Sequence, residues 1–94
     1  MNEGSFTVRV DVLDPQDRFI TSADCAIEVQ RGSGLWSGVL TGVEPYAHLG
    51  SGRHRLRLRD GGRAVIHIQA RQRVGQEERY PFTGEGSPPD LGRS

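Results

Sequence analysis

Lysine is absent from this sequence of 94 residues, and cysteine and tryptophan each occur once. A single cysteine, Cys25, can form neither an internal disulfide nor a cysteine-based zinc site. No run of about 18 apolar residues is present, which argues against a membrane-spanning helix, and the first residues lack the basic start and apolar stretch of a secretory signal. These absences predict a cytoplasmic protein without a disulfide, a metal, a cofactor or a membrane segment.

The basic residues are therefore all arginines, and twelve of them balance twelve acidic residues to give a formal net charge of zero. The balance is uneven along the chain, because residues 1–47 hold seven acids and three arginines while residues 48–94 hold five acids and nine arginines. A neutral chain is a poor polyanion binder as a whole, so we do not expect nucleic acid as a partner, but a local basic face is predicted. Arginine without lysine also indicates a GC-rich, bacterial coding sequence.

Alternation of apolar and polar side chains predicts strands throughout the chain. Residues 6–12 alternate in this way and indicate a half-buried strand with Phe6 and three valines facing inward. Glycine and proline number 13 and 5, which fits many turns between short strands. Further strands are predicted at residues 25–29, 35–40, 46–49, 53–59, 64–70 and 79–82.

Seven short strands at this spacing predict an all-β fold, a small antiparallel β-sandwich of the immunoglobulin-like or transthyretin-like kind. We expect this domain to cover residues 1–82. Residues 83–94 are rich in glycine and proline and bury too little to offset the entropy of ordering, so they are predicted to be a flexible tail.

The clearest feature is a hairpin between residues 53–59 and 64–70. A three-residue loop containing glycine places Leu58 opposite Ile66 on the inner face, whereas a two-residue loop would mix apolar and polar side chains on each face. This register predicts an outer row of arginines, namely Arg53, Arg55, Arg57 and Arg59, with Arg71 opposite Arg53.

The arginine row and Trp36 are the candidate partner-binding residues. Alternate strand positions lie about 6.6–6.8 Å apart, so the guanidinium groups could contact a protein partner or grip carboxylates and phosphates. The alternative is a row of polar side chains that simply face water. Trp36 is either a core residue or an exposed contact anchor, and together with Tyr46 and Tyr80 it would also suit carbohydrate binding.

Other reactive side chains favour structural roles. Of the three histidines, His54 is predicted to point inward and His67 outward, so they do not converge on a metal, and for His48 too a satisfied or exposed side chain is favoured. Asp14, Asp17 and Asp60 fit turns better than a Ca²⁺ loop, because their spacing matches no such loop. Cys25 lies on an alternating strand with no nearby base, which is typical of an inert buried thiol.

Several segments resemble the transthyretin-like, carboxypeptidase regulatory-like domains, over residues 6–72. The similarity lies in Val8-Arg-Val-Asp-Val-Leu-Asp14, Ala23-Asp-Cys-Ala-Ile-Glu-Val29, Thr41-Gly42 and Leu49-Gly-Ser-Gly-Arg-His-Arg-Leu-Arg-Leu58, all turn and packing residues. The resemblance implies a sandwich and, in one related family, hydroxyisourate hydrolase activity. Asp11 stands where that enzyme has its catalytic histidine, and Leu91-Gly-Arg-Ser94 is a poor match to its C-terminal Tyr-Arg-Gly-Ser motif, so catalysis is not expected.

The sequence thus favours a non-catalytic interaction or accessory module. We expect it to bind a protein partner, or a second copy of itself, through a sheet edge or through the outer arginine face. An anionic or carbohydrate ligand and a hydrolase of the type just named are the alternatives. Residues 87–91, Ser-Pro-Pro-Asp-Leu, are a possible tether or peptide ligand within the tail.

Overall fold

The computed structural model describes residues 5–30, 32–44, 47, 49–59, 61–86 and 88. These residues form seven strands and no helix, so the all-β prediction is confirmed. None of them belongs to a helix long and apolar enough to cross a membrane. The strands are β1 (Ser5–Leu13), β2 (Phe19–Val29), β3 (Trp36–Thr41), β4 (Gly52–Leu58), β5 (Arg63–Ile68), β6 (Gln72–Val74) and β7 (Glu77–Glu85).

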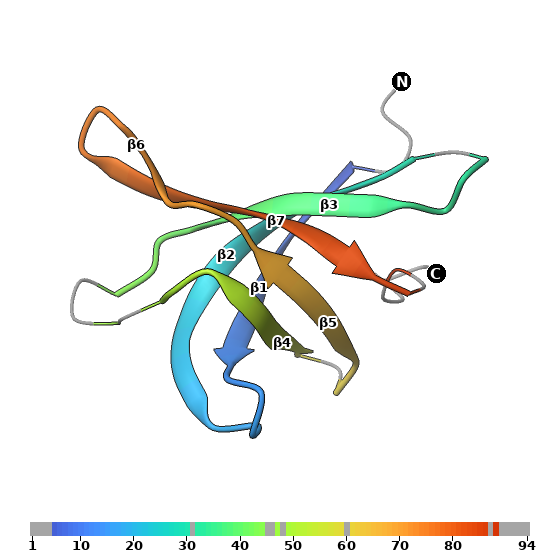
Figure 1. Cartoon of the computed structure of the whole chain (residues 1–94), viewed down its shortest axis with the longest axis horizontal. Coiled ribbons are helices and arrows are strands. Elements are labelled where there is room, and N and C mark those ends of the chain that lie inside the picture. Colours follow the sequence, from blue (N-terminus) through green and yellow to red (C-terminus); the bar gives the residue numbers. More distant parts are fainter. Residues whose placement is uncertain are drawn as a thin grey trace.

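Six of the strands close into a barrel (Figure 1). Two antiparallel meanders, β1–β2–β3 and β4–β5–β7, are joined at both edges, because β1 pairs with β4 and β3 pairs with β7. The predicted sandwich of two separate sheets is therefore replaced by one closed sheet. Inward and outward side chains alternate in the same way in both architectures, so the sequence pattern does not distinguish them. Strand β6 pairs only with the start of β7, and this hairpin projects from the barrel at the upper left of Figure 1.

The core fills the inside of the barrel with side chains from all six of its strands. Trp36 and Phe82 meet edge to face with ring centroids 6.1 Å apart. Gly84 lies directly against the indole of Trp36, where a Cβ atom would overlap the ring. The fully buried large side chains include Val10, Val12, Leu13, Ile27, Leu40, Leu56, Ile66 and Phe82.

The register of the β4–β5 hairpin differs from the prediction, since His54 rather than Leu58 lies opposite Ile66. The loop has three residues as expected, but it lies two residues earlier, because Leu58 donates its N–H to the carbonyl of Gly62 at 2.8 Å. Gly61 has a φ of 93°, a left-handed conformation that favours glycine and fixes the turn here. The displacement is an even number of residues, so the leucines of β4 still face inward and its arginines outward.

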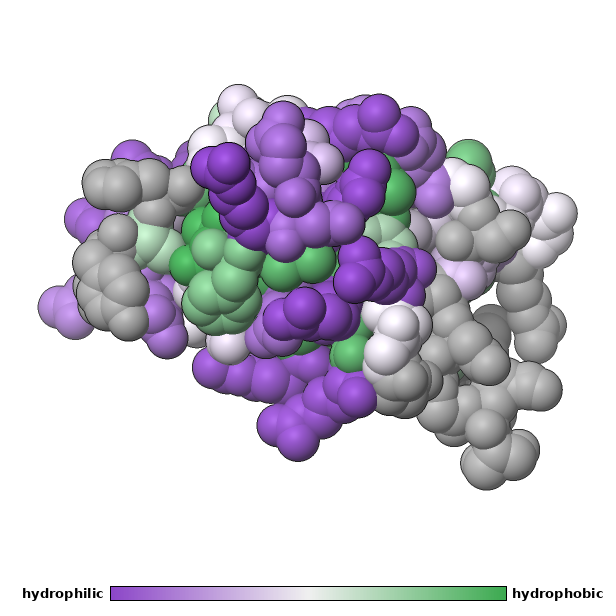
Figure 2. Space-filling view, turned by 90° about the horizontal axis from the view of Figure 1, so that it is seen from below, coloured by the Kyte–Doolittle hydropathy of each residue, from purple (hydrophilic) through white to green (hydrophobic). Residues whose placement is uncertain are grey.

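Other boundaries also differ from the prediction. Strand β2 begins at Phe19 rather than at residue 25, and β6 was not expected. Strand β7 continues to Glu85, three residues past the predicted end of the domain. Ala47 and Leu49 lie outside the strands, while Tyr46 and His48 of the strand predicted at 46–49 are not among the described residues. Figure 2 shows the face seen from below, which is covered mostly by hydrophilic side chains with limited apolar surface between them.

Candidate functional site

The predicted arginine row is present on β4, but each of its members there has an acidic partner. Arg53, Arg55 and Arg57 lie on the outer face of the strand, and Arg59 lies in the turn that follows it. Their ion pairs join distant parts of the chain, at nitrogen–oxygen distances of 2.9–3.1 Å. The pairs are Arg53 with Glu85, Arg55 with Asp17, and Arg57 with Asp11.

Strand register explains the shortest of these pairs. Asp11 of β1 lies directly opposite Arg57 of β4, so both side chains emerge on the same face. One carboxylate oxygen of Asp11 accepts from Nε and Nη2 of Arg57, at 3.2 and 2.9 Å, and the other accepts from the Ser22 hydroxyl at 3.2 Å. The acidic first half of the sequence thus neutralises the arginines of the second half inside one molecule.

A turn places the second acidic partner. The carboxylate of Asp14 accepts from the backbone N–H groups of Gln16 and Arg18, which builds the β1–β2 turn. Asp17 has a φ of 68° in this turn, and its carboxylate accepts from Arg55 at 3.1 Å and contacts Arg63 at 3.3 Å. The turn prediction for Asp14 and Asp17 fits this geometry, and Asp60 lies outside the described residues.

Arg71 does not join the row on β4. The residue opposite Arg53 is His67, and Arg71 instead lies 3.8 Å from Glu78 on the β6–β7 hairpin. Arg73 contacts the same carboxylate at 3.0 Å. The structure therefore separates Arg71 from the other four arginines of the predicted site.

Among the described residues, β1 has no ladder pair with β4 between Ser5 and Arg9. This segment, called the β1 edge below, pairs with β2, but its pairing with β4 starts only at Val10. Leu58 directs both its N–H and its C=O toward the β4–β5 turn, at 2.8 and 2.9 Å. Val10 lies opposite Leu58, so the alternation of an antiparallel ladder turns the backbone groups of Arg9 toward the β4 side, and those of Thr7 with them. Thr7 lies three residues before the start of this ladder, so among the described residues its backbone groups have no strand partner there.

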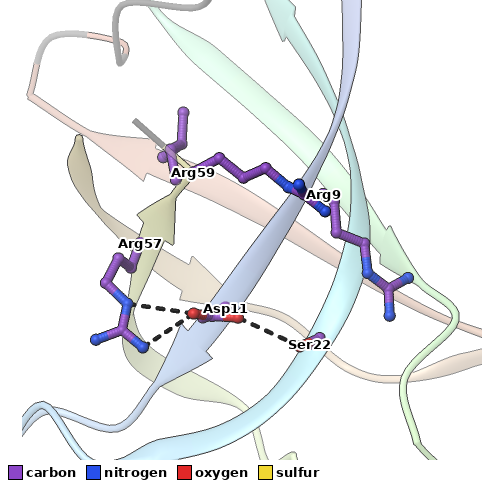
Figure 3. Close-up of a pocket in the computed structure, with 6 residues that line it drawn as sticks. Arg9, Asp11, Ser22, Arg57 and Arg59 are labelled. Carbon is purple, nitrogen blue, oxygen red and sulfur yellow. Dashed lines mark hydrogen bonds and ion pairs between the residues drawn. The ribbon is translucent and has the colours of Figure 1, made fainter. Parts of the chain in front are cut away.

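A basic hollow lies where β1 and β4 separate (Figure 3). It has a volume of about 380 Å³ and is lined by Arg9, Asp11, Ser22, Arg57, Leu58 and Arg59. Figure 3 shows Arg59 reaching across β1 toward Arg9. Arg9 contacts Asp24 at 3.1 Å, whereas Arg59 forms no ion pair within the described part of the chain. Three arginines therefore line a hollow that contains one carboxylate, and the guanidinium of Arg9 points away from it toward Asp24 of β2 (Figure 3).

Sequence reasoning identified Arg57 and Arg59 but missed Arg9 and the β1 edge. Arg9 lies two residues before Asp11, so both share the outer face of the predicted strand, and the sequence alone shows this. The length by which β1 extends beyond β4 depends on a pairing between residues more than forty positions apart, and no local pattern carries that information.

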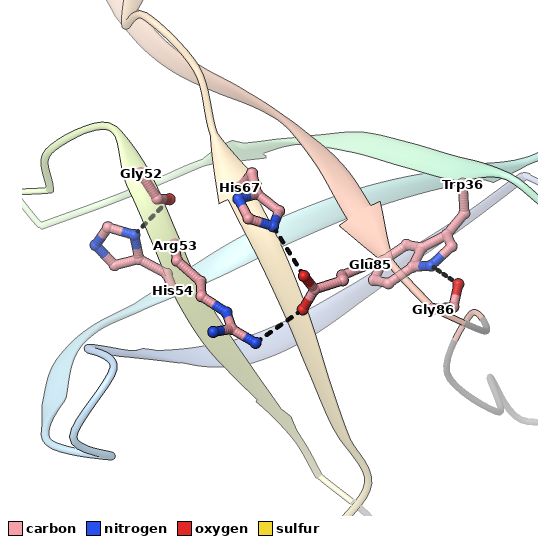
Figure 4. Close-up of polar contacts among 7 residues, drawn as sticks. All are labelled: Trp36, Gly52, Arg53, His54, His67, Glu85 and Gly86. Atoms are coloured by element: carbon pink, nitrogen blue, oxygen red, sulfur yellow. Dashed lines mark hydrogen bonds and ion pairs between the residues drawn. The ribbon is translucent and has the colours of Figure 1, made fainter.

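The two described histidines with side-chain contacts, His54 and His67, point to different sides of the sheet (Figure 4). Nδ1–H of buried His54 donates to the carbonyl of Gly52 at 3.1 Å, while His67 lies outside and contacts Glu85 at 3.3 Å. The hydrogen bond from His67, followed by the hydrogen bond and charge of Arg53, holds the pKa of Glu85 below its usual range. No group of three potential metal-ligating side chains occurs among the described residues.

Cys25 and Trp36 are both buried. Burial raises the pKa of the Cys25 thiol to about 12, so the thiol stays protonated at neutral pH. Trp36 is only 3% exposed, and its Nε1–H donates to the carbonyl of Gly86 at 3.1 Å (Figure 4). Trp36 is thus a core residue and not the exposed contact anchor of the candidate site. Tyr80 is likewise buried, which leaves no exposed aromatic platform for a sugar at either residue.

No protein-family model, no curated protein and no solved structure matches this chain. The β1 edge and the basic hollow are therefore interpreted from their geometry.

Proposed function

We propose that this protein is a non-catalytic binding module that takes an extended segment of a protein partner along the β1 edge. The observation that carries the proposal is the backbone of Thr7, which has no strand partner among the described residues on the side of β1 where β4 has already ended. An added strand would satisfy these groups by the main-chain hydrogen bonds used in β-strand addition.

The outer arginine face supports a partner site less well than this edge does. Arg53, Arg55 and Arg57 are engaged by Glu85, Asp17 and Asp11, so an acidic partner would have to compete with carboxylates that are already in place. Exposed ion pairs exchanged one for another give little net free energy. The β1 edge requires no such exchange, because the backbone groups of Thr7 that face away from β2 have no strand partner among the described residues.

The chemistry of the described side chains also favours binding over catalysis. Asp11 is held by Arg57 and Ser22, which suits a structural ion pair better than a general base. The Cys25 thiol is buried with a raised pKa, which disfavours nucleophilic attack.

The proposal is tested by blocking the edge. Thr7→Pro removes a backbone N–H that points away from β2, so the barrel should retain its pairing while the edge can no longer accept a strand. Peptides would be selected from a randomised nine-residue display library on the wild-type protein and mapped by amide chemical shifts. We expect the selected peptides to shift the amides of residues 5–9 and to lose at least tenfold in affinity for Thr7→Pro, with no loss for Thr7→Ala.

A second experiment tests the same hydrogen bonds without changing the protein, in case the proline variant does not fold. N-methylation of alternate amides in a selected peptide removes the same hydrogen bonds from the ligand side and leaves the protein unchanged. Selected peptides that bind elsewhere, or that bind equally well after N-methylation at every position, would contradict the proposal, as would a library that yields no binder.

A further inference from the structure

We infer that the β1 edge selects a strand in which apolar and acidic side chains alternate, with the acidic ones on the outer face of the barrel. This inference rests on the proposed function and adds the chemistry of the partner. The side chains on the two sides of β1 and the arginines of the hollow carry it.

Strand geometry fixes which side of the added strand meets which surface. Residues directly opposite each other in a ladder place their side chains on the same face. A residue opposite Arg9 would therefore point outward, into the solvent-facing hollow, and a residue opposite Val8 would point toward the inside of the barrel. The two kinds of position alternate along the added strand with a period of two.

The inward side of the β1 edge is apolar. Phe6 shares this side with Val8 and Val10, but it is 40% exposed because β4 does not extend far enough to cover it. Val8 is partly buried and packs against the core cluster. An inward side chain of the added strand would cover these two residues, so an apolar one is favoured by the area that it removes from water.

The outward side is basic. Arg9 and Arg59 both line the hollow beside the β1 edge, and Figure 3 shows Arg59 extended across β1 toward Arg9. Arg57 lines the same hollow, but its Nε and Nη2 already donate to Asp11. A carboxylate on the added strand would therefore bind Arg59, which has no ion pair among the described residues, whereas Arg9 is held by Asp24 on the β2 side.

The same charges disfavour a second copy of this chain as the occupant. Pairing two β1 edges about a twofold axis would bring two copies of Arg9 and Arg59 to one seam, with no further carboxylate from β1 at that point. The partner that fits is a heterologous strand that supplies the missing negative charge.

Three labelled peptides of equal length test the inference. They are acetyl-Ser-Val-Glu-Val-Glu-Val-Ser-amide and its versions with glutamine or lysine in place of both glutamates. We expect the glutamate peptide to bind at least fivefold more tightly than the glutamine peptide in a fluorescence polarisation titration, and the lysine peptide to bind most weakly. Raising the salt concentration from about 50 to 500 mM should weaken the glutamate peptide selectively, since the interaction is between exposed charges.

Protein variants identify the residues responsible. Arg59→Gln should reduce the preference for glutamate over glutamine by about fivefold, the upper range for an exposed ion pair. Arg53→Gln is the matched control, because Arg53 is on the same strand but pairs with Glu85 away from the hollow, and it should leave the preference unchanged.

The outcomes separate the inference from the proposed function. If the glutamate and glutamine peptides shift the amides of residues 5–9 with equal affinity, the edge binds strands but the inference is wrong. If none of the three peptides shifts these amides, both are wrong. If gel filtration shows a dimer that Thr7→Pro abolishes, a second copy occupies the edge and the inference is again wrong.

Discussion

Gly84 offers a sharp test of how the barrel is packed. A methyl group at this position would overlap the indole of Trp36, because Cε2, Cδ2 and Cζ2 of the ring are the nearest atoms. The ring cannot turn away freely, since it is buried, packs edge to face on Phe82 and donates to the carbonyl of Gly86. We therefore expect Gly84→Ala to destabilise the fold by about 3 kcal/mol, the upper range for overpacking a core.

The assay is urea unfolding followed by far-UV circular dichroism. This signal does not depend on tryptophan fluorescence, so it also serves for variants that lack Trp36, the only tryptophan of the sequence. A loss of about 3 kcal/mol in a domain of this size corresponds to a fall in Tm of roughly 12–24 °C. Gly50→Ala is the matched control, because Gly50 has open space around its Cα and no positive φ, and it should change stability by less than about 0.5 kcal/mol.

A double variant assigns the effect to the indole. Trp36→Leu removes the ring atoms that a methyl group at Gly84 would meet, so Gly84→Ala should cost at least 1 kcal/mol less in that background, within the range known for residues in contact. Gly84→Ala with wild-type stability, or with the same cost in both backgrounds, would refute the packing described here.

Three further predictions concern exposed charges and the buried thiol. In a double-mutant cycle of Asp11→Asn and Arg57→Gln, the coupling should be at most about 1 kcal/mol by urea unfolding, because both side chains are more than a third exposed; a larger value would indicate a desolvated pair. The pKa of Glu85 is lowered, first by His67, so its contribution to stability is complete above its unfolded pKa of about 4.3 and is lost as the pH falls through the lower folded pKa. Glu85→Gln should flatten this acidic limb of a Tm against pH curve, and an unchanged limb would contradict the assignment. Cys25 should not react with a thiol reagent at pH 8 until urea unfolds the protein, and fast labelling of the folded protein would be inconsistent with its burial.

Local patterns predicted which side chains face inward, but not how the strands associate. The alternation in β1 and β4 correctly assigned Val10, Val12, Leu56 and Leu58 to the core and placed His54 inward. These assignments need only a period of two, which each strand carries in its own sequence. The closure of the barrel depends on which strand edges meet, and β1 meets β4 through residues such as Asp11 and Arg57 that are 46 positions apart.

The candidate site was predicted in part for the same reason. The outward direction of Arg53, Arg55 and Arg57 follows from the strand pattern, whereas their neutralisation depends on the ladder between β1 and β4 and on the turn that holds Asp17. Trp36 shows a second limit, because a tryptophan that begins a strand can face either the core or the solvent. Its burial depends on the space left by Gly84, which lies almost fifty residues later in the chain.

The two meanders of the barrel also determine how the chain can fold. Each meander alone ends in two unpaired edges, so neither forms a closed structure until the other is in place. The joining contacts are far apart in sequence, which predicts slow folding compared with a protein of local contacts. Residues 1–47 carry a formal charge of −4 and residues 48–94 a formal charge of +4. The attraction between these opposite charges favours the encounter of the two meanders. Dissolved salt screens this attraction, so the folding rate should fall as the salt concentration rises.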